Sequence, residues 1–79
     1  MKLKYLIVTR HKECRNFLYK YCQLHNIENP IWIPHICSKS SVKNSIVFGF
    51  LPSELIGVCK EFYKIQYDQS NRMYIKRIK

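Results

Sequence analysis

The sequence predicts a single small α/β domain, with a mostly parallel sheet of four to five strands and two helices. Two observations lead to this fold class. Short apolar, β-prone runs alternate along the chain with a stretch of helical periodicity. Two of these runs also end abruptly, one in polar residues and one at a glycine. The chain has 79 residues, so residues 1–79 leave room for one domain only.

The first strand is expected at residues 2–9, where the run from Tyr5 to Val8 is typical of a strand buried on both faces. Residues 12–25 follow as a helix, which Asn26 ends because asparagine tolerates the left-handed conformation. The apolar residues of this helix recur with helical spacing and form one stripe against the sheet: Cys14, Phe17, Leu18, Tyr21, Cys22 and His25.

Residues 31–36 are predicted to be the second strand, which ends at Pro34 or lies at the sheet edge because proline lacks a backbone donor. Residues 37–44 are predicted to be a polar loop, and residues 45–48 a third strand that stops at Gly49. The second helix begins at Pro52 and buries a stripe from Leu55 to Phe62. A strand at 63–67, a turn at 68–71 and an edge strand at 73–78 complete the order β-α-β-β-α-β-β.

This order favours a small Rossmann-like sheet with right-handed crossovers. In that arrangement strands one and three are neighbours, and strand two lies beyond strand one. The junctions at residues 9–11 and 49–52 then lie side by side at the carboxyl edge of the sheet. Ligands of open α/β sheets bind at this edge, so we expect the site there.

The charge balance favours a polyanionic partner. Fourteen Lys and Arg residues face five Asp and Glu residues, which gives a formal charge of +9. Nucleic acid, a nucleotide or an anionic membrane surface satisfies such a charge, and a generic solvated basic surface is the alternative. No apolar run approaches the roughly 20 residues of a membrane span.

The four cysteines, Cys14, Cys22, Cys37 and Cys59, form no CxxC pair and no zinc-like spacing with a histidine. We interpret them as reduced, mostly buried side chains of a cytoplasmic protein. The sequence also shows no signal peptide. A chain this small has a marginal core. Self-association, in the simplest case as a homodimer, is therefore the expected stabiliser.

Arg10 and His11 are the principal candidates for chemistry. Arginine presents a planar fork of donors to a phosphate and keeps its charge. Histidine titrates near neutral pH and passes a proton to or from an oxygen. Together at a strand end they suit phosphodiester chemistry. The alternative is that His11 caps the first helix and Arg10 is an ordinary surface residue.

Secondary candidates surround this pair. The free backbone amides in the turn formed by Phe50, Leu51, Pro52 and Ser53 are expected to form an anion site at the start of the second helix, or an ordinary helix start. Ser40, Ser41 and Lys43 are candidate phosphate ligands in the polar loop. His35 is a candidate second proton carrier, or a structural histidine.

Two aromatic residues and one histidine complete the candidates. His25 is expected in the core or at its boundary, and Trp32 in the core or at a dimer interface. Phe50 or Trp32 is a candidate for base stacking.

Several enzyme classes are excluded by the motifs. The chain contains no P-loop, no GxGxxG, no GxSxG and no paired-acid constellation. Five acidic residues are too few to supply a two-metal phosphate site. A nuclease built on this sequence is therefore expected to be metal-independent and to need no cofactor.

The runs Ile7-Val8-Thr9-Arg10-His11 and Val47-Phe48-Gly49-Phe50-Leu51-Pro52-Ser53-Glu54-Leu55, with His35 between them, resemble a family of small CRISPR-associated proteins. The family is the branch numbered sixteen of the Csx group, which accompanies type III systems. Its members carry a strand that ends in Ser/Thr-Arg-His, a histidine at the end of the second strand and a V-x-G-x-L-P-x-x-L junction. Asn71-Arg72-Met73 stands where the family usually has Arg-Gly.

This resemblance implies a Rossmann-like homodimer that acts as a ring nuclease on cyclic oligoadenylate, with cyclic tetra-adenylate the expected ring. Cleavage by in-line attack of a ribose 2′-hydroxyl switches off type III CRISPR signalling. Arg10 is assigned to the phosphate, His11 to proton transfer, and Thr9, His35 and the amides after Gly49 to ligand contacts. No stable partner protein other than a second copy is expected. The alternatives are a non-catalytic protein that sequesters the messenger and a small basic nucleic-acid-binding module.

Overall fold

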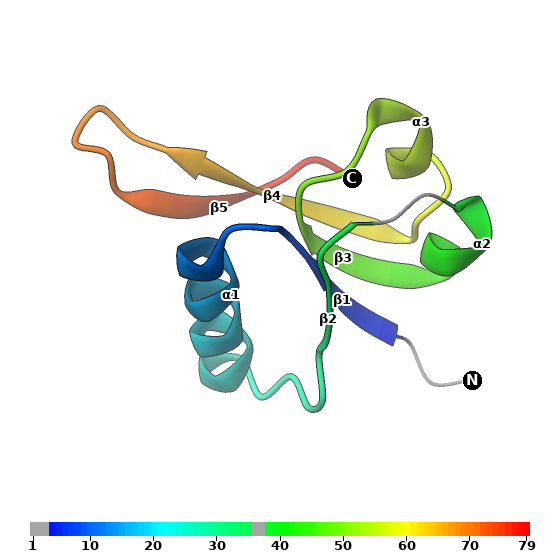
Figure 1. Cartoon of the computed structure of the whole chain (residues 1–79), viewed down its shortest axis with the longest axis horizontal. Helices are drawn as coiled ribbons and strands as arrows, with labels where there is room; N and C mark the ends of the chain where they lie inside the picture. The colour runs from blue at the N-terminus through cyan, green and yellow to red at the C-terminus, as the bar shows by residue number, and fades with distance from the viewer. Residues whose placement is uncertain (1–3, 36–37) are drawn as a thin grey trace.

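The computed structural model describes residues 4–35 and 38–79. Within them the chain forms an α/β fold in which one five-stranded sheet has the order β2-β1-β3-β4-β5 (Figure 1). The first four strands in this order are parallel, and β5 is antiparallel to β4. The elements are β1 (Lys4–Val8), α1 (Lys12–Leu24), β2 (Ile31–Ile33), α2 (Lys39–Val42), β3 (Ser45–Gly49), α3 (Ser53–Ile56), β4 (Glu61–Tyr67) and β5 (Met73–Arg77).

The strand order confirms two predictions. Strands β1 and β3 are neighbours, and the short β2 lies at the edge beyond β1. The register places Ile33, Val8 and Gly49 in one row, because Val8 pairs with each of the other two. The carboxyl ends of β2, β1 and β3 therefore meet at one edge of the sheet.

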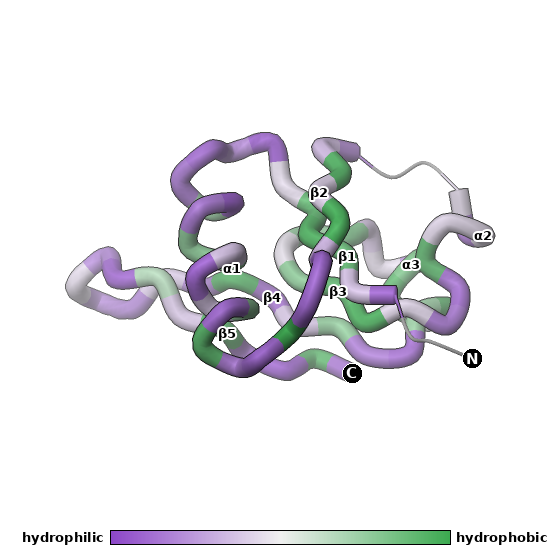
Figure 2. Tube along the Cα trace, turned by 90° about the horizontal axis from the view of Figure 1, so that it is seen from below, coloured by the Kyte–Doolittle hydropathy of each residue, from purple (hydrophilic) through white to green (hydrophobic). Residues whose placement is uncertain are grey.

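Two hydrophobic layers cover the sheet. On one face, Cys14, Leu18 and Cys22 of α1 pack against a cluster that includes Ile7, Ile46, Phe48 and Ile65. On the other face, Val42 of α2 and Leu55 of α3 pack against a cluster that includes Leu6, Val8, Val47 and Phe62. Successive strand residues point to opposite faces, so β1 and β3 are mostly apolar on both faces, and Ser45 at the start of β3 is the buried polar residue of the two strands. Figure 2 shows hydrophobic residues gathered along these two strands.

The helix count differs from the prediction. Residues 37–44 were expected to be a loop, yet they contain the four-residue helix α2, which Val42 anchors with 0% of its surface exposed. The helix after Gly49 is shorter than expected, since α3 ends at Ile56 with Gly57 as its C-cap. Phe62 is buried as predicted, but it belongs to β4. The described residues therefore hold three helices rather than two.

The second strand ends at Ile33, directly before Pro34, which fits the lack of a donor in proline. The expected last residue of that strand, Ile36, lies outside the described residues, as does Cys37. The three described cysteines are buried and free. None of the described helices is long and apolar enough to cross a membrane.

The end of α1 confirms one prediction and corrects another. Asn26 has a φ of 56°, the left-handed conformation expected of it. His25 was expected in the core or at its boundary, but it is exposed, because α1 ends at Leu24 and His25 is its C-cap residue. The centroid of its ring lies 4.1 Å from that of Tyr21.

Candidate functional site

A pocket of about 310 Å³ opens at the carboxyl edge of the sheet. Three segments that are far apart in the sequence form its walls: the end of β1, the residues after β2 and the turn after β3. The lining residues are Val8, Thr9, Arg10, His11, Pro34, His35, Phe50, Leu51 and Pro52. The structure therefore brings the two strand-to-helix junctions together with His35.

Gly49 allows β1 and β3 to end together. Its φ is +120°, and a Cβ atom added there would lie 2.2 Å from the carbonyl oxygen of Val8. The next amide, that of Phe50, donates a hydrogen bond of 3.0 Å to this same oxygen. The backbone that approaches Gly49 is thus that of the neighbouring strand, and the glycine fixes the direction of the turn at residues 50–52.

Thr9 connects the end of β1 to neighbouring residues through two hydrogen bonds. The residue is 2% exposed, and its Oγ1 accepts a hydrogen bond of 3.1 Å from the amide of His11. Its carbonyl oxygen accepts a hydrogen bond of 2.9 Å from Nε1 of Trp32 on β2. Thr9 thus holds the backbone of the pocket in place, in addition to lining it.

Trp32 is not a core residue. Its side chain is 39% exposed, and the guanidinium of Arg15 lies 4.6 Å from its ring centroid. The ring therefore covers the edge of the sheet beside the pocket, with α1 above it. A place at a dimer interface, the other expectation for Trp32, stays a prediction.

Arg10 and His11 are both exposed at the mouth of the pocket. His11 is the N-cap residue of α1, but its side chain makes no capping hydrogen bond. The one ion pair within residues 4–35 and 38–79 joins Arg77 to Glu61, so Arg10 has no carboxylate partner there. Both side chains are therefore available to an anion that enters the pocket.

The turn after Gly49 offers fewer amides than the sequence suggested. The amide of Phe50 is already bonded to Val8, and Pro52 has none. The amides of Leu51 and Ser53 donate no hydrogen bond within the described part of the chain. Of these two residues, Leu51 lines the pocket and Ser53 does not.

The loop candidates lie apart from this site. Ser40 and Ser41 belong to α2, and the hydroxyl of Ser40 is 2.7 Å from that of Ser38. Lys43 follows α2 and forms an isolated antiparallel β-bridge with Cys59. The two residues come just before β3 and β4 begin, so they lie at the amino edge of the sheet. None of the three lines the pocket. Val8 and Pro34 line it without having been predicted to do so, although each directly precedes a residue that was.

The pocket is positively charged. None of the five acidic residues lines it, whereas Arg10 does, together with two histidines. No group of three or more His, Cys, Asp or Glu residues among those described is placed to hold a metal ion.

The groups whose pKa is raised do not line this pocket. Burial raises the pKa of the Cys22 and Cys59 thiols. A hydrogen bond of 2.6 Å to Glu61 raises the pKa of Tyr63, and the contact with Cys14 raises the pKa of Tyr67.

Comparison with known proteins adds no relative to this description. No family model matches the chain, and neither the curated proteins nor the solved structures contain a match.

Proposed function

We propose that this chain is a metal-independent ring nuclease that cleaves cyclic oligoadenylate, with cyclic tetra-adenylate as its ring. On this proposal it belongs with the small Csx-group proteins of type III CRISPR systems, has a Rossmann-like fold and works as a homodimer in the cytoplasm. One observation carries the proposal: Arg10, His11 and the turn at 50–52 line one pocket that contains no carboxylate.

The reaction needs little from the protein beyond geometry and charge. The ribose 2′-oxygen forms a bond to the adjacent phosphorus while the bond from phosphorus to the 5′-oxygen breaks. The products are a 2′,3′-cyclic phosphate and a free 5′-hydroxyl, so one proton leaves the 2′-hydroxyl and one reaches the 5′-oxygen. Arg10 stabilises the charge that develops on the phosphate, and His11 delivers the proton to the leaving oxygen.

The volume of the pocket supports a shared site. At about 310 Å³ it is at the small end of ligand pockets, which span roughly 300–1,000 Å³. A ring of four nucleotides extends well beyond such a space. A second copy related by a two-fold axis supplies an identical pocket to a ring that has its own symmetry. Ile31 and Trp32, 49% and 39% exposed on the edge strand beside the pocket, offer apolar surface for that contact.

A second function, sequestration without cleavage, is favoured by one observation. The imidazole of His11 is exposed and makes no capping hydrogen bond, so nothing in the described structure fixes its orientation for proton transfer. A protein that only binds the messenger needs Arg10 and the turn after Gly49 but not His11.

Incubation with a panel of cyclic oligoadenylates in the presence of EDTA tests the proposal. We expect linear products that end in a 2′,3′-cyclic phosphate, resolved by chromatography and identified by mass. Intact ring at stoichiometric protein, with tight binding, would establish sequestration instead. Failure to bind any ring, with tight binding of duplex DNA and a salt slope near −0.9 per phosphate contacted, would establish a nucleic-acid-binding module.

A further inference from the structure

A row of residues crosses the sheet from the pocket to the β4–β5 hairpin. Gly49 pairs with Val8 on one side and with Lys64 of β4 on the other, and Lys64 pairs with Lys76 of β5. Neighbouring strands lie about 4.8 Å apart. The Cα atom of Lys64 is therefore one strand spacing from Gly49, and that of Lys76 is two. Two lysines thus begin beside the strand end that carries the turn at residues 50–52.

Both lysines project from the face that carries α3. Phe62, two residues before Lys64, packs in the cluster of α2 and α3, whereas Ile65 packs in the cluster of α1. Since strand residues alternate between faces, Lys64 shares the face of Phe62, and its cross-strand partner Lys76 does too. The pocket residues Val8 and Leu51 pack on this same face.

None of the described helices covers the two lysines. Both are exposed, and Figure 1 shows the β4–β5 hairpin extending beyond α3. Like charges directly opposite each other on two strands destabilise a sheet. Neither lysine forms an ion pair within the described residues, where Arg77 and Glu61 are the one pair. The row therefore ends in two uncompensated positive charges on the pocket side of the sheet.

The next row outward adds an aromatic ring. Tyr74 pairs with Gln66 across the hairpin, and its hydroxyl donates a hydrogen bond of 2.8 Å to Oε1 of Gln66. The ring is 42% exposed and lies on the same face as Lys76, two residues away. Basic side chains interleaved with exposed aromatic rings are the usual surface for single-stranded nucleic acid.

We propose that Lys64 and Lys76 form a second phosphate-binding subsite, continuous with the pocket of Arg10 and His11. It takes a phosphodiester of the same oligoadenylate that lies outside the pocket, and Tyr74 stacks on an adjacent adenine. This inference rests on the proposed function for the identity of the ligand. The lysines do not touch the reacting phosphate, so they act on affinity and not on the chemical step.

A charge reversal at position 76 separates binding from stability. Lys76→Glu replaces a like-charged cross-strand pair with an opposite-charged one, so we expect a higher melting temperature. The same variant should bind cyclic tetra-adenylate about tenfold more weakly, while turnover of the saturated protein stays within about twofold. Lys4→Glu is the matched control, because Lys4 is exposed at the amino end of β1 and its substitution changes the net charge by the same amount. Equal losses of affinity in the two variants would overturn the subsite.

A further pair of measurements separates failure of the subsite from failure of the proposed function. If the wild-type protein cuts the ring and Lys76→Glu binds no worse than Lys4→Glu, the subsite alone is wrong. If the wild-type protein neither binds nor cuts any ring, linear tetra-adenylate is titrated instead and followed by ¹H–¹⁵N spectra. Shifts of the Lys64 and Lys76 amides together with that of Gly49 then support the subsite without the ring nuclease. Unmoved lysine amides overturn it.

Discussion

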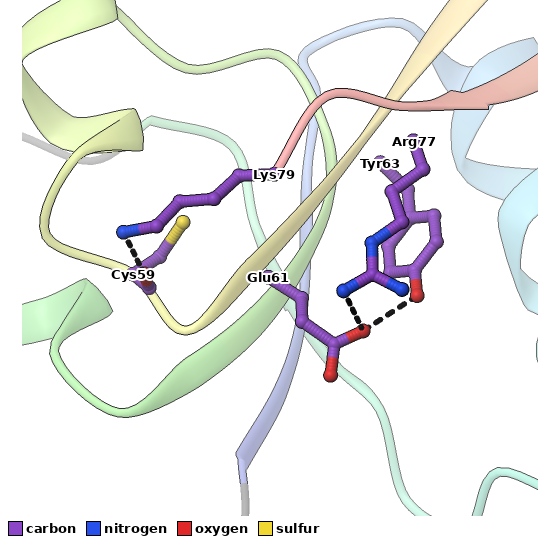
Figure 3. A network of polar contacts seen from close by, with 5 residues as sticks. All are labelled: Cys59, Glu61, Tyr63, Arg77 and Lys79. Atoms are coloured by element: carbon purple, nitrogen blue, oxygen red, sulfur yellow. Dashed lines mark hydrogen bonds and ion pairs between the residues drawn. The ribbon is translucent and has the colours of Figure 1, made fainter.

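Among the described residues, the guanidinium of Arg10 at the pocket mouth has no ion-pair partner, and the imidazole of His11 makes no capping hydrogen bond. Arg77 and Lys79, in contrast, each have partners within the chain (Figure 3). Nη2 of Arg77 lies 3.7 Å from Oε1 of Glu61, and this oxygen also accepts a hydrogen bond from the hydroxyl of Tyr63. The ammonium of Lys79 donates to the carbonyl oxygens of Gly57 and Cys59, each at 2.7 Å.

The backbone around the pocket, unlike the side chains of Arg10 and His11, has partners within the chain. Around the pocket the main chain is held closely, by the Val8–Phe50 and Thr9–Trp32 hydrogen bonds. Such rigid support under unpaired charges is what a preorganised anion site requires. In the network of Figure 3 the charged side chains have partners within the chain, because Arg77 pairs with Glu61 and Lys79 donates to backbone carbonyl oxygens, and their effect is on stability. The difference separates charges that stabilise the fold from charges that are available to a ligand.

Substitution at Gly49 should give the largest effect on stability. In Gly49→Ala the new Cβ meets the Val8 carbonyl at 2.2 Å, in a backbone conformation that alanine rarely adopts. We expect a loss of roughly 3 kcal/mol in the free energy of unfolding, measured by urea denaturation. Gly57→Ala is the control, because a Cβ there meets nothing within 4 Å and should change stability by less than about 1 kcal/mol. Similar losses in both variants would contradict the account of the pocket backbone.

On the proposed function, the largest effect on activity should come from His11. His11→Ala should lower the cleavage rate of cyclic tetra-adenylate by about 10²–10⁴-fold, because general acid catalysis contributes that much. Affinity should stay within about tenfold, since the proton transfer proposed for the imidazole acts mainly in the transition state. Single-turnover cleavage and equilibrium binding measure the two quantities separately. Parallel loss of rate and affinity would show that His11 positions the ligand.

Trp32 offers a smaller test of the rigid backbone. Trp32→Phe keeps an aromatic ring beside Arg15 but removes the donor to the Thr9 carbonyl. We expect a loss of about 1 kcal/mol in stability, the usual net value of one hydrogen bond. Amide hydrogen exchange should rise at residues 9–11 more than in α1. Uniform exchange across the chain would show that this bond does not hold the pocket.

The smallest effect should come from Tyr63. Because Glu61 accepts a hydrogen bond from its protonated phenol, folding raises the pKa of Tyr63 above its ordinary value of 10.0. The stability from this contact is fully present below the ordinary pKa and is lost as pH rises through the higher folded value. Melting temperature should therefore fall more steeply above about pH 10 in the wild type than in Tyr63→Phe. Identical alkaline slopes would show that the contact adds nothing to stability.

The sequence predicted the central sheet well because β1 and β3 are apolar on both faces and end in recognisable junctions. It missed α2 because four residues with a single buried valine carry no helical period. Phe62 fits both the helical spacing after Leu55 and the alternation of β4, so the predicted boundary between this helix and β4 differs from the observed one. Local patterns do not show which strands pair in register. The contact of Gly49 with Val8 and the row to Lys64 and Lys76 therefore emerged only from the tertiary structure.

A paired substitution of the two arginines tests the central contrast most directly. On the proposed function, Arg10→Gln should weaken binding of cyclic tetra-adenylate about 10- to 100-fold, the value of a hydrogen bond to a charged group, and leave the melting temperature unchanged. Arg77→Gln should lower stability by at most about 1 kcal/mol, because the side chain of Arg77 is 62% exposed in its pair with Glu61, and leave binding unchanged. Equal effects of the two substitutions on affinity would contradict the assignment of the ligand to the carboxyl edge of the sheet.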